Sequence, residues 1–303
     1  MRRRALLTED RNKYLDKYLT FIPLEDGTFT WNSPSSEEHE LYNDIEFSLD
    51  GGITWNALEH DTSTPTVEAG NEIMFKGLCK PFVIEYERVG CGKFSSTCQF
   101  NVEGNIMSLL FGDDFKDKYT LINEDVQTDY RASHFRFLFL DCNVVNAKNL
   151  MLPATELTKG CYANIFSGCI NLTEAPVLLA TTLTNLCYYC MFDGCASLTE
   201  APELPATELT EGCYADMFGG CTSLTKAPVL RATILQPYCY SDMFYGCTSL
   251  NEVKCLALDM SAEECTIRWM DGVGSDGTFF KAETAEWTRG TNGIPEGWSV
   301  SFA

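Results

Sequence analysis

Apolar residues in the second half of the chain recur with a fixed period of 26 residues. The columns that keep this period are Cys161, Cys187, Cys213, Cys239 and Cys265; Cys169, Cys195, Cys221 and Cys247; Tyr162, Tyr188, Tyr214 and Tyr240; Phe166, Phe192, Phe218 and Phe244; Gly168, Gly194, Gly220 and Gly246; and Leu172, Leu198, Leu224 and Leu250. One such unit cannot bury its own apolar face, whereas stacked units join identical side chains into continuous ladders. The period therefore predicts an array of stacked coils.

Within one unit, the pattern separates inner from outer positions. The side chains expected to point inward are Leu172, Ala175, Leu178 and Leu183 from one wall and Cys161, Ile165 and Phe166 from the other. The second wall is expected to be a short helical turn that Gly168 closes in a left-handed conformation. The chain has 15 cysteines, an odd number that cannot all pair within one molecule. We expect most of them to be reduced apolar fillers, with disulfides between successive ladder positions as the alternative.

The array weakens at both ends, as terminal repeats do. Residues 135–160 form a degenerate first unit in which Cys142 falls one position early, and residues 239–264 lose the Ala-Pro pair found at 175–176, 201–202 and 227–228. After Cys265 the pattern stops, and a tail with Trp287 and Trp298 is predicted to cover the last coil. These changes predict a solenoid over 121–264, with an N-terminal cap and degenerate repeat at 121–160, and a C-terminal cap over 265–303.

The repeat units resemble a known family. The pattern Cys-Tyr-x-x-Met-Phe-x-Gly-Cys-x-Ser-Leu-Thr-x-Ala-Pro-x-Leu looks like the BspA-like leucine-rich repeats of gut Bacteroidetes and their phages. The closing run from Gly277 to Trp298 is similar to the tail that ends many such arrays, so the likeness covers roughly residues 135–303. It implies a right-handed solenoid used for adhesion or recognition, without catalysis.

Residues 20–120 are predicted to be β-structure. The segment 19–31 alternates around an Asp26-Gly27 turn, and 45–55 forms a second candidate hairpin around Gly51 and Gly52. Several short strands with turns at this spacing suggest a sandwich of immunoglobulin type. The whole chain is thus expected to be an α+β repeat protein: an Ig-like β-sandwich at 20–120, followed by a short right-handed leucine-rich-repeat solenoid.

The second hairpin also carries a motif known from enzymes. Ser48, Asp50, Gly52, Thr54 and Trp55 match the Asp-box pattern of sialidase-like propellers. In that family the box is a structural hairpin, in which the aspartate satisfies turn amides and the tryptophan packs underneath. One box in about 100 residues is too little chain for a propeller of four-stranded blades. A structural turn is therefore preferred to a glycan-acting enzyme.

The distribution of charge sets the N-terminal residues apart from the rest of the chain. The chain has 22 basic and 43 acidic residues, for a net charge of −21, which argues against nucleic-acid binding. Residues 1–19 are instead basic, and their apolar residues fall near helical spacing. We interpret them either as a solvated terminus or as an arm docking to a larger assembly; the docking residues would be Arg2, Arg3, Arg4, Tyr14 and Tyr18. Thr8, Glu9 and Asp10 interrupt a signal-like start, so no export signal is expected, and no apolar run suggests a membrane span.

The sequence offers little catalytic or metal-binding chemistry. His39, His60 and His134 have no partner at a recognisable motif spacing, and there is no phosphate-binding glycine loop. Cys187 and Cys190 form a lone Cys-x-x-Cys without the second pair of a zinc site. The Asp-Gly pairs at 271–272 and 276–277 lack the EF-hand pattern, although calcium binding is an alternative to ordinary turns. We therefore expect no enzyme activity, no cofactor and no metal.

Variable positions within the constant repeat are the candidate binding surface. They are Glu174, Glu200, Glu203, Lys226 and Arg231, which would form a small face with an acidic and a basic side; the alternative is that they are simply solvated.

Our first hypothesis for the function is a recognition protein of a phage particle, such as a virion fibre or decoration protein. Its arm would bind other virion or surface proteins, and its solenoid would bind a host surface protein or glycan. A bacterial cell-surface adhesin is the alternative, and a homo-oligomer is left open.

Overall fold

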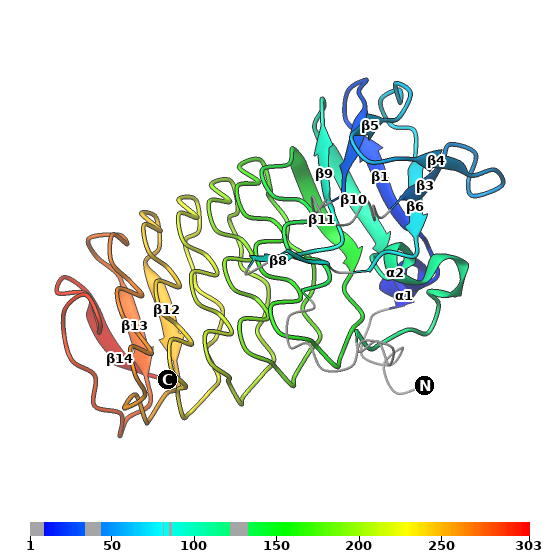
Figure 1. Ribbon diagram of the computed structural model, residues 1–303. Coiled ribbons are helices and arrows are strands. Elements are labelled where there is room, and N and C mark those ends of the chain that lie inside the picture. The colour runs from blue at the N-terminus through cyan, green and yellow to red at the C-terminus, as the bar shows by residue number, and fades with distance from the viewer. Residues whose placement is uncertain (1–8, 34–43, 81, 85–86, 122–132) are drawn as a thin grey trace.

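The computed structural model describes residues 9–33, 44–80, 82–84, 87–121 and 133–303. A layered β unit lies at the N-terminal end, and turn-rich coils stack away from it towards the C-terminus (Figure 1). Helix accounts for 4% of the residues and strand for 26%, so the architecture is mostly β. One cluster of buried residues runs through both regions, from Leu19 to Trp298.

The elements of the N-terminal region are α1 (Glu9–Leu15), β1 (Leu19–Pro23), β2 (Phe29–Asn32), β3 (Ile45–Ser48), β4 (Asn56–Leu58), β5 (Thr62–Ser63), β6 (Ile73–Gly77), β7 (Phe82–Ile84), β8 (Glu87–Val89), β9 (Lys93–Ser96), β10 (Phe100–Asn105), α2 (Ser108–Phe111) and the 3₁₀ turn η1 (Gly112–Asp114). The coil array contains β11 (Val144–Met151), β12 (Glu252–Cys255), β13 (Thr278–Lys281) and β14 (Ser299–Phe302).

The main sheet joins the two regions. Its strand order is β11-β10-β1-β6-β3-β4, and a smaller sheet has the order β5-β2-β9. The β10–β11 pair is parallel, with Gly104 opposite Leu150, while the other neighbours in the main sheet are antiparallel. Aromatic rings fill the space between the two sheets: Phe21 of β1 lies 5.2 Å from Phe29 of β2 and 4.8 Å from Phe94 of β9, measured between ring centroids. The first coil is thus built directly on the N-terminal sheet.

The predicted hairpin at 19–31 is wrong. β1 and β2 belong to different sheets, so the Asp26-Gly27 segment carries the chain from one layer to the other. β2 alternates buried and half-buried residues, whereas β1 is buried along almost its whole length. A pattern of apolar positions does not say which strand is the neighbour. The immunoglobulin type is also wrong, because its constant-type sheets have the strand orders ABED and CFG, whereas the main sheet here has six strands and takes the parallel strand β11 from the coil array. The second hairpin is confirmed in part: β3 pairs antiparallel with β4, but β4 begins at Asn56, just beyond the predicted range of 45–55.

The coils stack through backbone hydrogen bonds and aromatic ladders. The amide of Tyr162 donates to the carbonyl of Cys187 at 3.0 Å, and the amide of Tyr188 donates to that of Cys213 at 3.1 Å. Phe192 lies 5.7 Å from Phe166 and 5.6 Å from Phe218 between ring centroids, with nearly parallel planes. Each side chain therefore packs on its own counterpart in the next coil.

The expected helical turn is absent from the coil wall. Amides alternate: those of Cys161, Ala163 and Ile165 donate to the carbonyl three residues back, whereas those of Tyr162, Asn164 and Phe166 donate to the next coil. Asn164 and Gly168 both have positive φ, at 56° and 72°, which interrupts any helix. Gly168 thus adopts the left-handed conformation we predicted, but it closes no helix. The wall is a run of turns because half of its amides bond between coils.

The prediction of an α+β leucine-rich-repeat solenoid is therefore wrong. The described chain is mostly β, with several separate sheets in place of one continuous parallel sheet along the array. On this wall the bridges between coils are isolated and lie near the two ends of the array, such as Asn146 with Glu174 and Lys226 with Glu252. Proline explains the interruption, because Pro176, Pro202 and Pro228 lack the amide that a ladder needs. Where Lys254 replaces the proline, strand β12 forms.

None of the 15 cysteines forms a disulfide, and all of them are buried. Cys161, Cys187 and Cys213 have no exposed surface, and they line one side of the core. Burial raises the pKa of the Cys161 thiol to about 12 and that of Cys187 further, so both stay protonated at neutral pH. They act as small apolar fillers, and the disulfide alternative is not realised.

The last coil is covered by a three-stranded parallel sheet and a tryptophan stack. β13 pairs with β12 and with β14. Trp269 lies 6.3 Å from Tyr240 and 5.2 Å from Trp287 between ring centroids, and Trp298 is buried and donates to the carbonyl of Gly274. The tyrosine ladder thus ends in an indole pair that covers its last ring.

Candidate functional site

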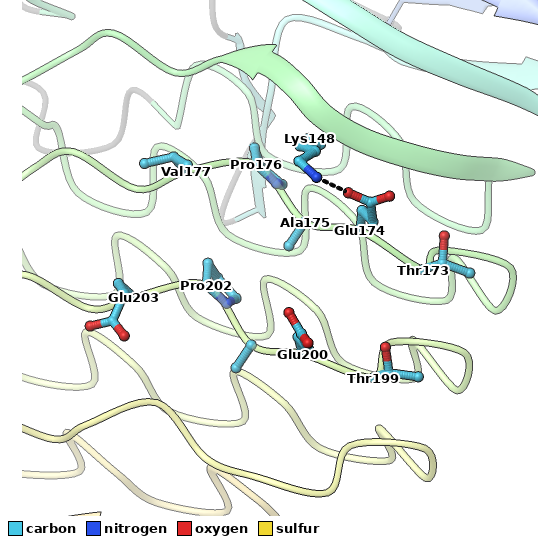
Figure 2. A pocket seen from close by; sticks show the side chains of 11 residues that line it. Lys148, Thr173, Glu174, Ala175, Pro176, Val177, Thr199, Glu200, Pro202 and Glu203 are labelled. Atoms are coloured by element: carbon cyan, nitrogen blue, oxygen red, sulfur yellow. Dashed lines mark ion pairs between the residues drawn. The ribbon is translucent and has the colours of Figure 1, made fainter. Parts of the chain in front are cut away.

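The array carries a hollow on one side, between two successive coils. It is lined by the segments 173–177 and 199–203 and by Lys148 of β11, and its volume is about 530 Å³ (Figure 2). We call it the coil-face groove. It holds three of the five predicted binding residues: Glu174, Glu200 and Glu203.

The groove has an apolar floor with a fixed shape. Pro176 and Pro202 lie on adjacent coils, and Ala175 and Ala201 precede them (Figure 2). Each proline fixes its own φ and restricts the residue before it, so this stretch of each coil is stiff. Leu172 and Leu178 point into the core on either side of the segment and anchor it from within. The polar side chains of the groove therefore stand on a rigid base.

One column of charges crosses the groove from coil to coil. Lys148, Glu174, Glu200, Lys226 and Glu252 each follow the previous member by 26 residues. Lys148 Nζ lies 2.8 Å from Glu174 Oε2, and Asn146 donates to the other oxygen of that carboxylate at 3.0 Å. At the other end of the column, Lys226 pairs with Glu252. The column thus closes into two ion pairs with Glu200 between them.

Glu200 is the unmatched member of this column. It is exposed, and among the described residues no ion pair or hydrogen bond engages its carboxylate. The nearest cations in the column are held by other carboxylates, because Lys148 and Lys226 reach Glu174 and Glu252 instead. Glu203 is neutralised separately by Arg231, at 2.9 Å between Nη2 and Oε2. One free negative charge therefore faces the groove.

The predicted face is thus only partly one site. Glu174, Glu200 and Glu203 line the groove, while Lys226 and Arg231 do not line it and instead form ion pairs. Sequence reasoning missed Lys148 and the hydroxyls of Thr173 and Thr199, which also line it. The 26-residue step contained the signal for Lys148, because counting back one unit from Glu174 reaches it.

The tyrosines of the predicted docking arm pack within the chain. The Tyr18 hydroxyl donates to Asp113 at 2.7 Å, and its ring lies 4.9 Å from those of Trp55 and Phe115. Tyr14 packs beside Leu15 and Met151 of the first coil. Neither tyrosine therefore belongs to an arm that extends away from the rest of the chain. Arg2, Arg3 and Arg4 lie outside the described residues.

The Asp-box segment is a turn held by its aspartate. Asp50 accepts hydrogen bonds from the amides of Ile53 and Thr54 at 3.1 and 2.9 Å, and from the Thr54 and Ser48 hydroxyls. The Thr54 bonds, followed by that from Ser48, lower the pKa of Asp50 to about 2. Trp55 packs beneath the turn against Tyr18 and lies under the Lys76 ammonium, 4.3 Å from the ring centroid. The box thus plays the structural role that its motif predicts.

The other candidate chemistry is dispersed among the described residues. His134 Nδ1 lies 3.2 Å from the Thr158 hydroxyl, and Cys190 is a buried residue with a positive φ of 51°. Within the described ranges, no group of three or more histidine, cysteine, aspartate or glutamate side chains is arranged to hold a metal ion. His39 lies outside those ranges.

No protein-family model matches the chain, and neither a curated protein nor a solved structure matches it. None of the helices among the described residues combines the length and apolar character needed to cross a membrane.

Proposed function

We propose that the chain is a non-enzymatic recognition protein that binds a partner on a cell surface through the coil-face groove. The observation that carries the proposal is the groove itself, in which variable charged side chains stand on a constant apolar frame. Such surfaces are the usual binding faces of repeat proteins, because the frame is stiff while individual positions are free to vary. The unmatched Glu200 supports the choice of this face, since a charge without a counter-ion contributes to selective binding.

The proposed location is the surface of a phage particle, with host surface protein or glycan as the partner. The resemblance of the repeat units to those of gut Bacteroidetes and their phages supports this placement. Because Tyr14 and Tyr18 pack within the chain, attachment to the particle would depend on Arg2, Arg3 and Arg4. Mass spectrometry of purified particles tests the location. Detection of the protein in the particles supports this location, and its absence from them contradicts it.

Binding to intact gut bacteria tests the function and its site together. The groove-filling variant Thr199→Trp is compared with Thr207→Trp, since both residues are exposed threonines of the array but only Thr199 lines the groove. We expect labelled wild-type protein and Thr207→Trp to bind, and Thr199→Trp to lose binding at least tenfold. Equal binding by the two variants would refute the groove as the recognition site. Absence of binding by wild type to cells, to arrayed glycans and to arrayed peptides would refute the recognition function.

A further inference from the structure

We infer that the coil-face groove takes the lysine or arginine side chain of an extended polypeptide segment, with Glu200 as its counter-ion. The inference rests on the proposed function and specifies the chemistry of the partner. It concerns one charge and one apolar strip on the same face.

One carboxylate of the groove lacks a positively charged partner. Glu174 has both oxygens engaged, one by Lys148 and one by Asn146, and Glu203 is paired with Arg231. Glu200 alone among the three carboxylates has no partner within the described part of the chain. A ligand that brings one positive charge completes the alternation of the column, whereas a ligand with a carboxylate or phosphate meets repulsion.

The surface next to Glu200 suits the stem of a long basic side chain. Pro202 and Ala201 follow Glu200 directly, and Pro176 lies on the neighbouring coil, so apolar atoms extend away from the carboxylate (Figure 2). Lysine and arginine bury their methylene stems along such surfaces while the charged end remains at a polar group. A neutral sugar would contact the same strip but would leave Glu200 without a counter-charge. The combination therefore favours a polypeptide over a neutral glycan.

The net charge of the protein acts in the same direction. At −21 the molecule attracts cationic partners at long range, and this attraction weakens as salt shortens the screening length. Long-range attraction alone does not distinguish one glutamate from another. A local role for Glu200 therefore requires that its removal matter more than the removal of an equivalent charge elsewhere.

An array of extended peptides, probed with the full chain, makes this comparison. Each peptide carries a central lysine, arginine, norleucine or glutamate in an otherwise constant Gly-, Ser- and Pro-containing sequence. Wild type is compared with Glu200→Gln and with the control Glu208→Gln, which removes one exposed glutamate of the same coil outside the groove. Thermal unfolding verifies that all variants are folded.

We expect wild type to prefer lysine and arginine peptides over norleucine. Glu200→Gln should weaken their binding by about two- to fivefold, within the range of an exposed ion pair, while Glu208→Gln leaves it unchanged. Charge reversal in Glu200→Lys should transfer the preference to the glutamate peptides. Equal loss in Glu200→Gln and Glu208→Gln, or binding without preference for a cation, would overturn the inference.

The failure of this inference is distinguishable from the failure of the proposed function. If wild type binds arrayed glycans and Thr199→Trp abolishes that binding while Glu200→Gln does not, the groove recognises a glycan and the cation inference is wrong. If Thr199→Trp changes no binding at all, the groove is not the site and both proposals fail.

Discussion

The layered β unit and the coil array bury similar aromatic rings in different ways. In the β unit, Phe21 meets rings from five other segments at mixed angles between ring planes, from 40° to 78°. In the array, Phe192 meets its own counterparts above and below, with planes within 5° and 11° of parallel. The first core depends on segments distant in sequence, and the second on a contact repeated at every unit. Removing one ring should therefore destabilise only the neighbouring coils in the array, but most of the core in the β unit.

The largest expected effect comes from removing one ring from each core. Phe192→Ala and Phe21→Ala should each lower the free energy of unfolding by about 3–5 kcal/mol, because both rings are fully buried. Hydrogen exchange should then differ between them. In Phe192→Ala the faster amides should centre on the coils containing Phe166 and Phe218, whereas in Phe21→Ala they should cover both sheets of the β unit. The same exchange pattern in the two variants would remove the distinction between the regions.

A smaller effect is expected at Asp216, a residue of the array whose backbone φ is positive, at 53°. Burial, assisted by the carboxylates of Asp242 and Asp193, raises the pKa of Asp216 to about 6, so the charged form is disfavoured in the folded state. Its contribution is therefore most favourable below about pH 4 and is lost as the pH rises through 6. Asp216→Asn should stabilise the protein at pH 7 by about 1 kcal/mol, allowing for solvent screening, and the gain should vanish near pH 4.

The control for this prediction is Asp242→Asn. Asp242 occupies the same column one coil later, with a φ of 52° against 53° at Asp216, but it is paired with Arg268 at 2.8 Å. Its substitution should give no stabilisation at pH 7. Stabilisation of the same size in both variants would show that the carboxylates act through general repulsion and not through burial of Asp216.

The smallest expected effect lies in the Asp-box turn of the β unit, where the pH dependence has the opposite sign. Because hydrogen bonds lower the pKa of Asp50 to about 2, its contribution is present above about pH 4 and is lost as the pH falls through 2. Asp50→Asn should speed hydrogen exchange at the amides of Ile53 and Thr54 without shifting the thermal midpoint. A global shift in that midpoint would mean that the turn supports more of the core than its exposed position suggests.

The sequence predicted contacts well where a fixed period determined them. Counting 26 residues correctly pairs Phe166 with Phe192 and places Cys161 and Cys187 in one buried column. The same counting reaches Lys148 from Glu174 and Glu252 from Lys226, so both ion pairs of the charge column could be read from the sequence. The period does not predict the partners of the backbone hydrogen bonds. The alternation of amides within and between coils, which replaces the expected helix, depends on three-dimensional stacking.

The β unit was harder to predict for a related reason. The alternation in 19–31 identified two strands, but β1 has β10 and β6 as neighbours, and these begin about 50 to 80 residues later in the chain. No local pattern encodes those partners. The Asp box was the exception, because the hydrogen bonds that close its turn lie between residues at most four apart.

The most direct test of the account is hydrogen exchange of wild-type protein with and without the partner that it captures from a cell surface. Recognition through the coil array predicts protection in peptides covering 173–177 and 199–203, with little change in the Asp-box turn at 48–55. Protection confined to that turn or to the C-terminal strand β14, with the groove segments unchanged, would contradict the account.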